Sequence, residues 1–444
     1  LAKKLFPINR SLTGNGVRET LSIIKSKVPL EKKSFSSGKK VFDWVVPQEW
    51  EIKDGYILDL KTKKKFADFK KNNLHIVGYS EPKNEIISFN KLKKHIFFEK
   101  KNKKAIPYVT SYYKKNWGFC LSKIDFNKMK KNKYKILIDS KFFKGKMDYG
   151  EILLKGKSKK EILFTTYICH PSMANNEISG PVVNTALIDY VRKIKNKKYS
   201  YRFIFIPETI GTIAYIQKNL TKLKKDLLAG FVINCAGDER DFSFVHTPSK
   251  NTFADEIMKS SFIGIKKKTI YDFKDRSSDE RQYCSPGIEL PVCSFSRSKA
   301  GSKTFPEYHT SLDDFKVVTE KGLYGSFNLL RNIIDSFELI FFSKFFFYHF
   351  LGIKIPPDNE LRNCRLFSCR AIFSSNNGAL NPLFRRNFSY SVLENFSFFK
   401  KFLSFLIIFL KELSLIIIPN SWISKAITFF PIYSDKIFSI KSVL

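Results

Sequence analysis

Residues 162–180 read ILFTTYICHPSMANNEISG, and this stretch predicts the fold more directly than any other part of the chain. The apolar run 162–168 is typical of a buried strand, and a polar loop follows it. Ser179-Gly180 then opens an apolar segment, 182–191, that has the character of a helix. His170 therefore lies where a strand ends, at the rim of an α/β sheet, where ligands and metals usually bind.

The alternation of strands and helices extends on both sides of this stretch. Strand-like runs alternate with helical segments near 181–194 and 211–220, and the strand-like runs are 134–138, 151–154, 201–207 and 230–235. The pattern continues through 255–335. Such alternation predicts an α/β fold, with a mainly parallel sheet flanked by helices.

Two regions depart from this pattern. Residues 35–130 carry alternating runs around a turn-like Asp54-Gly55 and predict a small β-rich domain, inserted into an α/β domain that takes 1–34 and 131–340. Residues 341–444 form a divergent C-terminal region. Its apolar run 402–418 has Lys411-Glu412 at the centre, which favours a buried helix over a membrane-spanning one, although membrane contact through this run stays open.

The net charge of +37 raises the question of nucleic-acid binding. Lysines are spread along all 444 residues, so we interpret the charge mainly as solvated surface and keep a polyanion surface as the less favoured reading. The seven cysteines lack metal-ligand spacing. The first residues have no apolar core like that of a secretory signal, so we expect free thiols and a cytoplasmic location.

Four polar stretches follow strand-like runs and hold the candidate chemistry. They contain His170 with Asn176-Glu177, Glu208, Asn234 with Asp238, and Tyr308-His309 with Asp313. Parallel strand ends meet at one rim, so we expect these side chains to converge. Imidazole and carboxylate are zinc ligands, and a further glutamate can act as a general base in hydrolysis.

Each of these residues also has a purely structural interpretation. His170 and His309 would then be bonded to backbone or lie on a surface loop. Glu208 would cap the helix that follows it, and Asp238 would belong to a turn. The other four histidines lack comparable acidic company, and we interpret them as structural.

The four stretches, in this order, resemble the co-catalytic zinc aminopeptidase superfamily. The chain is more similar still to a bacterial aminopeptidase-like family that is often labelled as polysaccharide-biosynthesis proteins. The segments that carry this resemblance are LFPINRSLTGNGVRETL (5–21), CHPSMANNEISGP (169–181), PETIGTIAY (207–215), SSDERQYCSPGIELPV (277–292) and FPEYHTSLDD (305–314). The resemblance covers about 3–337. It implies an inserted β domain and a C-terminal winged helix, but 341–444 show no such pattern, and a shifted reading frame there stays open.

The chain departs from the superfamily at three ligand positions. Asn176 stands where the metal-bridging aspartate is expected, Thr209 replaces the second glutamate of a pair, and Asn234 replaces an aspartate. These losses favour one zinc ion over two, because an amide oxygen is a weak, uncharged ligand. We expect His170, His309 and a carboxylate to bind it, with Asp238 preferred and Glu177 second.

The sequence therefore predicts a zinc-dependent, aminopeptidase-type hydrolase of a peptide or related amide, with Glu208 as general base. The expected substrate-binding residues are Asn176, Asp279, Arg281 and Tyr308. A link to surface-polysaccharide metabolism follows from the resemblance alone. The rivals are an inactive binding protein on a peptidase scaffold and a nucleic-acid-associated regulator. A cysteine hydrolase using Cys169 is disfavoured, because adjacent strand residues point to opposite faces.

Overall fold

The structure is a computed structural model that describes residues 1–350, with side chains to residue 339. The predictions of a membrane-contacting run at 402–418 and of an atypical C-terminal region therefore lie outside the described residues, except that 341–350 continue the last helix. The main sheet of the described part has eight strands in the order β1-β10-β12-β11-β13-β16-β14-β15. Their bounds are β1 Glu31–Ser36, β10 Lys146–Leu154, β11 Glu161–Tyr167, β12 Ser200–Ile206, β13 Leu227–Ile233, β14 Ser243–Val245, β15 Thr269–Tyr271 and β16 Val292–Ser296.

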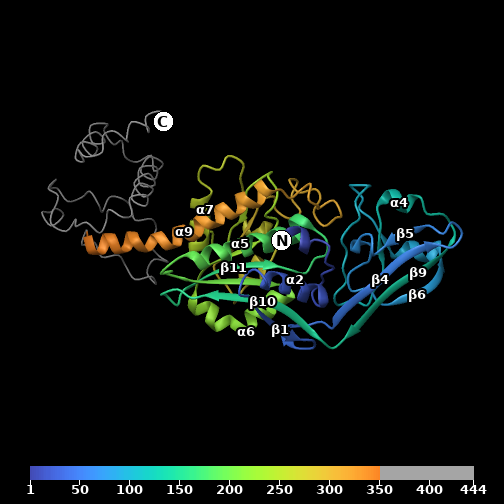
Figure 1. Ribbon diagram of the computed structural model, residues 1–444, viewed down its shortest axis with the longest axis horizontal. Helices are drawn as coiled ribbons and strands as arrows, with labels where there is room; N and C mark the ends of the chain where they lie inside the picture. Colours follow the sequence, from blue (N-terminus) through green and yellow to red (C-terminus); the bar gives the residue numbers. More distant parts are fainter. Residues whose placement is uncertain (351–444) are drawn as a thin grey trace. The chain divides into compact units, whose positions relative to one another are not determined.

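The centre of this sheet is parallel and its margins are mixed. Strands β12, β11, β13 and β16 run parallel to their neighbours, whereas β10 is antiparallel to β12 and β14 is antiparallel to β16. Helices cover both faces, so the predicted α/β fold is confirmed. Figure 1 shows α5 (Ser179–Lys193), α7 (Phe253–Ser261) and α9 (Glu320–Phe350) on one side and α6 (Ile210–Asp226) on the other.

Strand alternation divides the apolar residues between two cores. Ile162 and Phe164 of β11 pack with α2 (Asn15–Lys25), α5, α7 and α9, whereas Leu163 faces the opposite core beside α6. The ring of Phe164 stacks between Phe203 and Phe231 of the neighbouring strands, with 5.3 Å between centroids on each side. Burying both faces of the central strands explains their continuous apolar sequence, and it fixes where each strand ends.

A second sheet, with the order β5-β4-β9-β6, forms the inserted β-rich part. Its core contains Ile57, Phe119, Tyr134 and Ile136. The remaining elements of the described part include the strands of this second sheet. The bounds are α1 Ala2–Leu5, β2 Lys40–Val41, β3 Trp44–Val45, β4 Glu49–Asp59, β5 Lys65–Asp68, β6 Lys83–Ser88, α3 Phe89–Leu92, β7 Ile96–Phe97, β8 Phe119–Cys120, α4 Lys123–Asn127, β9 Lys133–Phe143 and α8 Glu280–Tyr283, with 3₁₀ turns at Asn73–His75, Lys93–His95 and Phe273–Asp275.

The insert differs from its sequence-based description in two respects. Strand β9 belongs to the small sheet and pairs with β4 and β6, although it lies beyond residue 130. Its alternating apolar residues face the small core, which is why it joins that sheet. Asp54-Gly55 is no turn but lies inside β4, beside a bulge. A Cβ at Gly55 would come within 2.6 Å of Ile76, so close packing accounts for this glycine.

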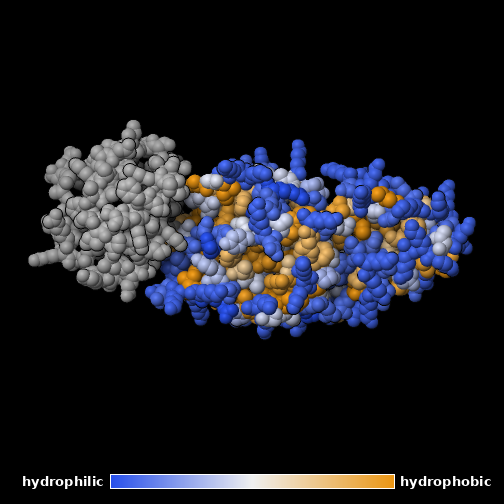
Figure 2. Space-filling model, turned by 45° about the horizontal axis from the view of Figure 1, so that its top comes forward, coloured by the Kyte–Doolittle hydropathy of each residue, from blue (hydrophilic) through white to orange (hydrophobic). Residues whose placement is uncertain are grey.

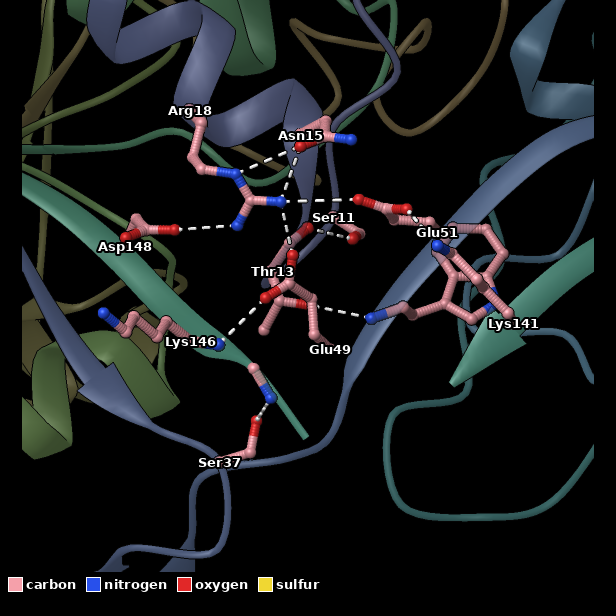
Figure 3. A network of polar contacts seen from close by, with 12 residues as sticks. Ser11, Thr13, Asn15, Arg18, Ser37, Glu49, Glu51, Lys141, Lys146 and Asp148 are labelled. Atoms are coloured by element: carbon pink, nitrogen blue, oxygen red, sulfur yellow. Dashed lines mark hydrogen bonds and ion pairs between the residues drawn. The ribbon is translucent and has the colours of Figure 1, made fainter. Parts of the chain in front are cut away.

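Polar contacts join the two parts where the chain passes between them (Figure 3). Arg18 of α2 forms ion pairs with Glu49 and Glu51 of β4 and with Asp148 of β10, the last at 3.1 Å. Glu49 also accepts a hydrogen bond from the amide of Lys146 at 2.9 Å. Arg18 of the α/β part thus binds carboxylates of the insert, on β4, and of the main sheet, on β10.

Among the coloured residues in Figure 2, hydrophilic ones project around the edges of the drawn face and apolar ones gather near its middle. Within residues 1–350, no helix combines the length and apolar character that crossing a membrane requires. Five of the seven cysteines are described, and all five are buried free thiols, as expected.

Candidate functional site

The carboxyl ends of β11 and β12 bring His170 and Glu208 together. His170 follows β11 by three residues and Glu208 follows β12 by two, and the Nε2 of the histidine is 3.8 Å from the Oε2 of the glutamate. His309 arrives from the loop after β16, and its ring centroid is 5.3 Å from that of His170. Three residues far apart in the sequence therefore meet at one rim of the sheet.

His170 is buried and held by contacts with Arg10 and Glu177. Its carbonyl accepts a hydrogen bond from Nε of Arg10 at 2.9 Å, and its Nδ1 is 2.9 Å from Oε2 of Glu177. Burial, with the nearby charge of Arg10, lowers the pKa of His170 to about 3. The imidazole is therefore neutral at physiological pH.

Glu177 and Arg10 form an ion pair from which solvent is wholly excluded. Their charged atoms are 3.4 Å apart, and neither side chain is exposed. Burial raises the pKa of Glu177, while the charge of Arg10 opposes the change. Arginine stays protonated in proteins, so it favours the carboxylate form of Glu177. Glu177 then accepts the Nδ1 proton of His170, and Nε2 keeps its lone pair facing Glu208.

His309 occupies an unusual backbone conformation, with φ of 56°. Its ring stacks on that of Tyr308 with 3.9 Å between centroids and 16° between planes. Burial and the neighbouring His170 lower the pKa of His309 well below its ordinary value. Its Nε2 is buried and has no hydrogen-bond partner among residues 1–339.

Glu208 is fixed by the turn that connects β12 to α6. Its Oε1 accepts a hydrogen bond from Oγ of Ser278 at 3.0 Å, while its side chain stays 23% exposed. Burial, with the negative charge of Asp279, raises the pKa of Glu208 to about 8. A glutamate in this condition can hold or release a proton near neutral pH.

Asp279 holds the turn that precedes α6. Its carboxylate accepts hydrogen bonds from the amide of Thr209 at 2.8 Å and from Oγ1 of Thr212 at 2.7 Å. Thr209 has φ of 61°, so the turn that carries Glu208 is held in an unfavourable conformation. Asp279 is buried, and these contacts give it a positioning role. Arg281, two residues on, is exposed.

Asp238 is surrounded by donors, most of which come from distant loops. Its two oxygens accept hydrogen bonds from Nδ2 of Asn175, from the amide and Oγ of Ser298 and from the amide of Arg240, all at 2.8–3.0 Å. A carboxylate has about four sites for accepting hydrogen bonds. Asp238 therefore has little capacity left for a metal ion, and it joins the loops after β13 and β16.

A single π-helical turn, Ala174–Ile178, carries Asn176 and Glu177 into the site. Asp313 holds this turn, because its carboxylate accepts hydrogen bonds from the amides of Asn175 at 2.7 Å and Asn176 at 2.8 Å. The side chain of Asn176 donates to the hydroxyl of Tyr167. Its Oδ1 is buried and lacks a hydrogen-bond partner within the described part of the chain.

The reason given for excluding Cys169 is wrong. Strand β11 ends at Tyr167, so alternation no longer applies at residue 169, and Sγ of Cys169 lies 3.6 Å from Nδ1 of His170. Cys169, His170 and Glu177 place ligand atoms within 4.8 Å of one another. Burial raises the pKa of Cys169 well above its ordinary value, which disfavours the nucleophilic thiolate.

Two important neighbours of the histidines did not emerge as site residues from the sequence. Arg10 lies inside the N-terminal segment 5–21 that carries the family resemblance. The sequence therefore marked this region, but it assigned no role to Arg10. Tyr108 comes from the insert, and its ring lies 5.0 Å from that of His170 and 5.2 Å from that of His309. Nothing in its local sequence, AIPYVTSYY, distinguishes it.

Comparison with known proteins supports the fold and the family. A family model described as a domain of unknown function (DUF4910) matches residues 1–339. A Clostridium acetobutylicum protein, named for polysaccharide biosynthesis and an aminopeptidase-like domain, is 42% identical over 339 residues, which are 76% of this chain and 77% of that protein.

Solved structures give the same assignment. A crystal structure of a protein from C. acetobutylicum, titled as a peptidase, is 41% identical and has a TM-score of 0.73, covering 76% of this chain and 79% of the other. A zinc aminopeptidase from Bacillus subtilis has a TM-score of 0.54 at 12% identity, covering 76% and 93%. The second likeness is one of fold. Because the family model covers most of the chain and a relative shares 42% of its residues, the chain belongs to the DUF4910 family, and its α/β part has the fold of the zinc aminopeptidases.

Proposed function

We propose that this protein is a zinc-dependent amide hydrolase of the aminopeptidase type. The proposal rests on two neutral imidazoles, those of His170 and His309, whose ring centroids are 5.3 Å apart. Beside them, Oε2 of Glu208 lies 3.8 Å from Nε2 of His170. Neutral imidazoles are zinc ligands, and a glutamate beside them is the group that metal-assisted hydrolysis needs.

The side chains at this rim of the sheet have the chemistry to hold a cation. The buried Nε2 of His309 and the buried Oδ1 of Asn176 each have a lone pair but no hydrogen-bond partner within residues 1–339. Nε2 of His170 also carries a lone pair in the tautomer that Glu177 selects. We therefore propose His170 and His309 as the principal ligands, with the amide oxygen of Asn176 as a weaker third.

The cluster of Cys169, Nδ1 of His170 and Glu177 is a less favourable place for a cation. The buried guanidinium of Arg10, only 3.4 Å from Glu177, would repel it. Glu177 is better suited to orient His170 through Nδ1, as carboxylates commonly do for metal-binding histidines. Asp238, with its oxygens engaged elsewhere, is correspondingly less favoured as a ligand than its sequence position indicates.

One ion remains the better proposal than two. Asn176, Thr209 and Asn234 supply no negative charge where a second cation would need it, and Oδ1 of Asn234 already accepts a hydrogen bond from Oγ of Ser296 at 2.7 Å. These three positions therefore offer neutral oxygens to a second ion where the superfamily pattern has carboxylates.

Different residues of the chain would transfer the proton, position the base and contact the substrate. A zinc ion, when bound, would supply Lewis acidity that polarises an amide carbonyl and makes water more acidic. Glu208 would take a proton from the attacking water on Oε2 and later deliver it to the departing amine. Ser278 holds Oε1 and leaves Oε2 facing His170. The partly exposed Tyr308 and the exposed Arg281 are the proposed substrate contacts at the open side.

The substrate class is a peptide or a related amide. The aminopeptidase-like fold supports this class in general, and the name of the Clostridium relative motivates a link to surface-polysaccharide metabolism. A cytoplasmic location stays a prediction from the sequence.

The proposal is tested by metal content and turnover in matched variants. Purified protein should contain close to one zinc per chain, and it should cleave some member of a panel of aminoacyl p-nitroanilides. Glu208→Gln should lower kcat at least about 100-fold while zinc is retained, because general-base catalysis contributes about 10²–10⁴-fold. Glu256→Gln, on the exposed side of α7, is the control and should match the parent.

His309→Ala should lose zinc, whereas His95→Ala in the insert should keep it. If Glu208→Gln turns over at the parental rate, Glu208 is not the base. Retention of zinc by His309→Ala would place the ligands elsewhere.

The second candidate is a non-catalytic binding protein on the same scaffold. Asn176, Thr209 and Asn234, which replace three carboxylates of the superfamily pattern, favour it specifically. Protein that contains no zinc, and takes up none from solution, would support this second candidate over the hydrolase.

A further inference from the structure

The insert reaches into the site through the segment 105–112, which pairs with the loop that carries His309. The amide of Tyr108 donates to the carbonyl of His309 at 2.8 Å. The amide of Ser311 donates to the carbonyl of Ile106 at 2.8 Å, and Oγ of Ser311 accepts from the amide of Ile106 at 3.0 Å. These bonds form a short antiparallel pairing between two chain segments that are about 200 residues apart.

The ring of Tyr108 touches both histidines edge to face. It makes angles of 66° with the ring of His170 and 83° with that of His309. Its hydroxyl is 3.0 Å from that of Tyr112, a contact within the same segment. Edge-to-face contacts are directional, so this ring restricts how far each imidazole can rotate.

His309 depends on such outside contacts. Its backbone is in a left-handed conformation that is unfavourable for a residue with a Cβ, and its Nε2 has no hydrogen-bond partner within residues 1–339. The stacked Tyr308 is its sequence neighbour and moves with the same loop. The carbonyl bond and the ring of Tyr108 therefore supply restraint from outside that loop.

The same segment also adjoins the residue that holds His170. Tyr108 and Thr110 line a cavity of about 10 Å³ together with Arg10. One segment of the insert thus packs against the surroundings of both imidazoles, although it binds neither through a side-chain hydrogen bond.

We propose that the insert is part of the metal centre, and that Tyr108 is a positioning residue which fixes the separation and orientation of His170 and His309 for a single cation. The cation's identity as zinc rests on the proposed function above. Groups that orient metal-binding histidines typically change metal affinity 10- to 100-fold when they are removed.

The test uses the full chain with Tyr108→Ala, Tyr108→Phe and Tyr113→Ala. Tyr113 directly follows the segment 105–112 but is 52% exposed, and its hydroxyl donates to the carbonyl of Val45 in the insert. The zinc dissociation constant is measured by competition with a chromophoric chelator. Hydrogen exchange is followed in peptides covering 306–313.

Tyr108→Ala should weaken zinc binding at least about tenfold and speed exchange across 306–313. Tyr108→Phe, which keeps the ring, should stay within about threefold of the parent, and Tyr113→Ala should match it. Should Tyr108→Ala fail to fold, Tyr108→Leu replaces it, because leucine fills much of the space without a flat ring. Parental zinc affinity in the folded Ala or Leu variant would overturn the proposal.

Hydrogen exchange at 306–313 distinguishes a failure of this proposal from a failure of the proposed function. If the parent binds no zinc, faster exchange at 306–313 in Tyr108→Ala still supports positioning by Tyr108, and the zinc hydrolase alone fails. If the parent binds no zinc and exchange is unchanged, Tyr108 does not position His309.

Discussion

Arg10 shows how much a single buried side chain contributes to this site. Its Nε bonds to the carbonyl of His170 and forms an ion pair with Glu177, and its Nη1 bonds to the carbonyl of Leu5 at 2.7 Å. The arginine thus holds the N-terminal segment, the end of β11 and the π-helical turn together. Its charge would also repel a cation placed at Nδ1 of His170.

Arg10→Met should strongly destabilise the protein, because it leaves Glu177 buried without its counter-charge. Removing one partner of a buried ion pair costs about 3–5 kcal/mol. The free energy of unfolding in urea measures this loss. Arg192→Met, at an exposed position near the end of α5, should change it by less than about 0.5 kcal/mol. Equal stability of the two variants would show that Arg10 is dispensable for folding.

At the scale of elements, a charged network joins β10 to β11 and β12, the two strands whose carboxyl ends lead to the site. Arg202 of β12 binds Glu161 of β11 through Nε at 2.5 Å and Nη2 at 2.8 Å, and it also pairs with Glu151 of β10. Lys222 of α6 binds Glu161 as well. This network ties β10, β11 and β12 together near the amino ends of β11 and β12, at the opposite end of these two strands from the site.

The network makes stability depend on pH. Burial alone would raise the pKa of Glu161, but bonds and charge from Arg202 and Lys222 outweigh it and lower the pKa. A carboxyl whose pKa is lowered by folding stabilises the protein above its unfolded pKa, about 4.3, and this stabilisation is lost as pH falls through the folded value.

Glu161→Gln should therefore cost about 3 kcal/mol at pH 7, and the difference from the parent should shrink below about pH 4. Unfolding free energies measured between pH 7 and pH 3 test this. A difference that stays constant over that range would show that Glu161 stabilises by packing rather than by charge.

At the scale of the described molecule, two separate sets of contacts connect the insert to the α/β part. Where the chain crosses between the two parts, Arg18 of the α/β part pairs with carboxylates of the insert. At the histidines, the segment 105–112 of the insert pairs with the loop that carries His309. A small antiparallel sheet held at two separate places is expected to unfold together with the larger part.

Arg18→Met should lower the free energy of unfolding by about 1–2 kcal/mol, since three carboxylates lose a partner that is itself about one-third exposed and screened by water. Arg192→Met again serves as the control. A loss below about 0.3 kcal/mol would mean that the crossing is held by its apolar packing alone.

Much of the α/β part follows from local sequence patterns. The apolar run at 162–168 predicts β11 because a strand buried on both faces must be apolar throughout, and the strand-end positions of His170 and Glu208 follow from it. The order of the polar stretches indicates the family. The bounds of the insert are less predictable, because β9 resembles any half-buried strand and only its pairing with β4 assigns it to the small sheet.

The sequence by itself determined the alternating strands and helices, the family, and the histidines and glutamate that meet at the rim, since all of these depend on periodicity and on short runs of residues. Only the tertiary structure decided which carboxylate oxygens are already occupied by hydrogen-bond donors and which are not. Asp238 and Asp279 look like ligands or substrate contacts in the sequence, but donors from distant loops occupy them, and Tyr108 enters from the insert. Hydrogen bonding between remote segments leaves no local pattern, so the roles of these three residues emerge only when the chain is folded.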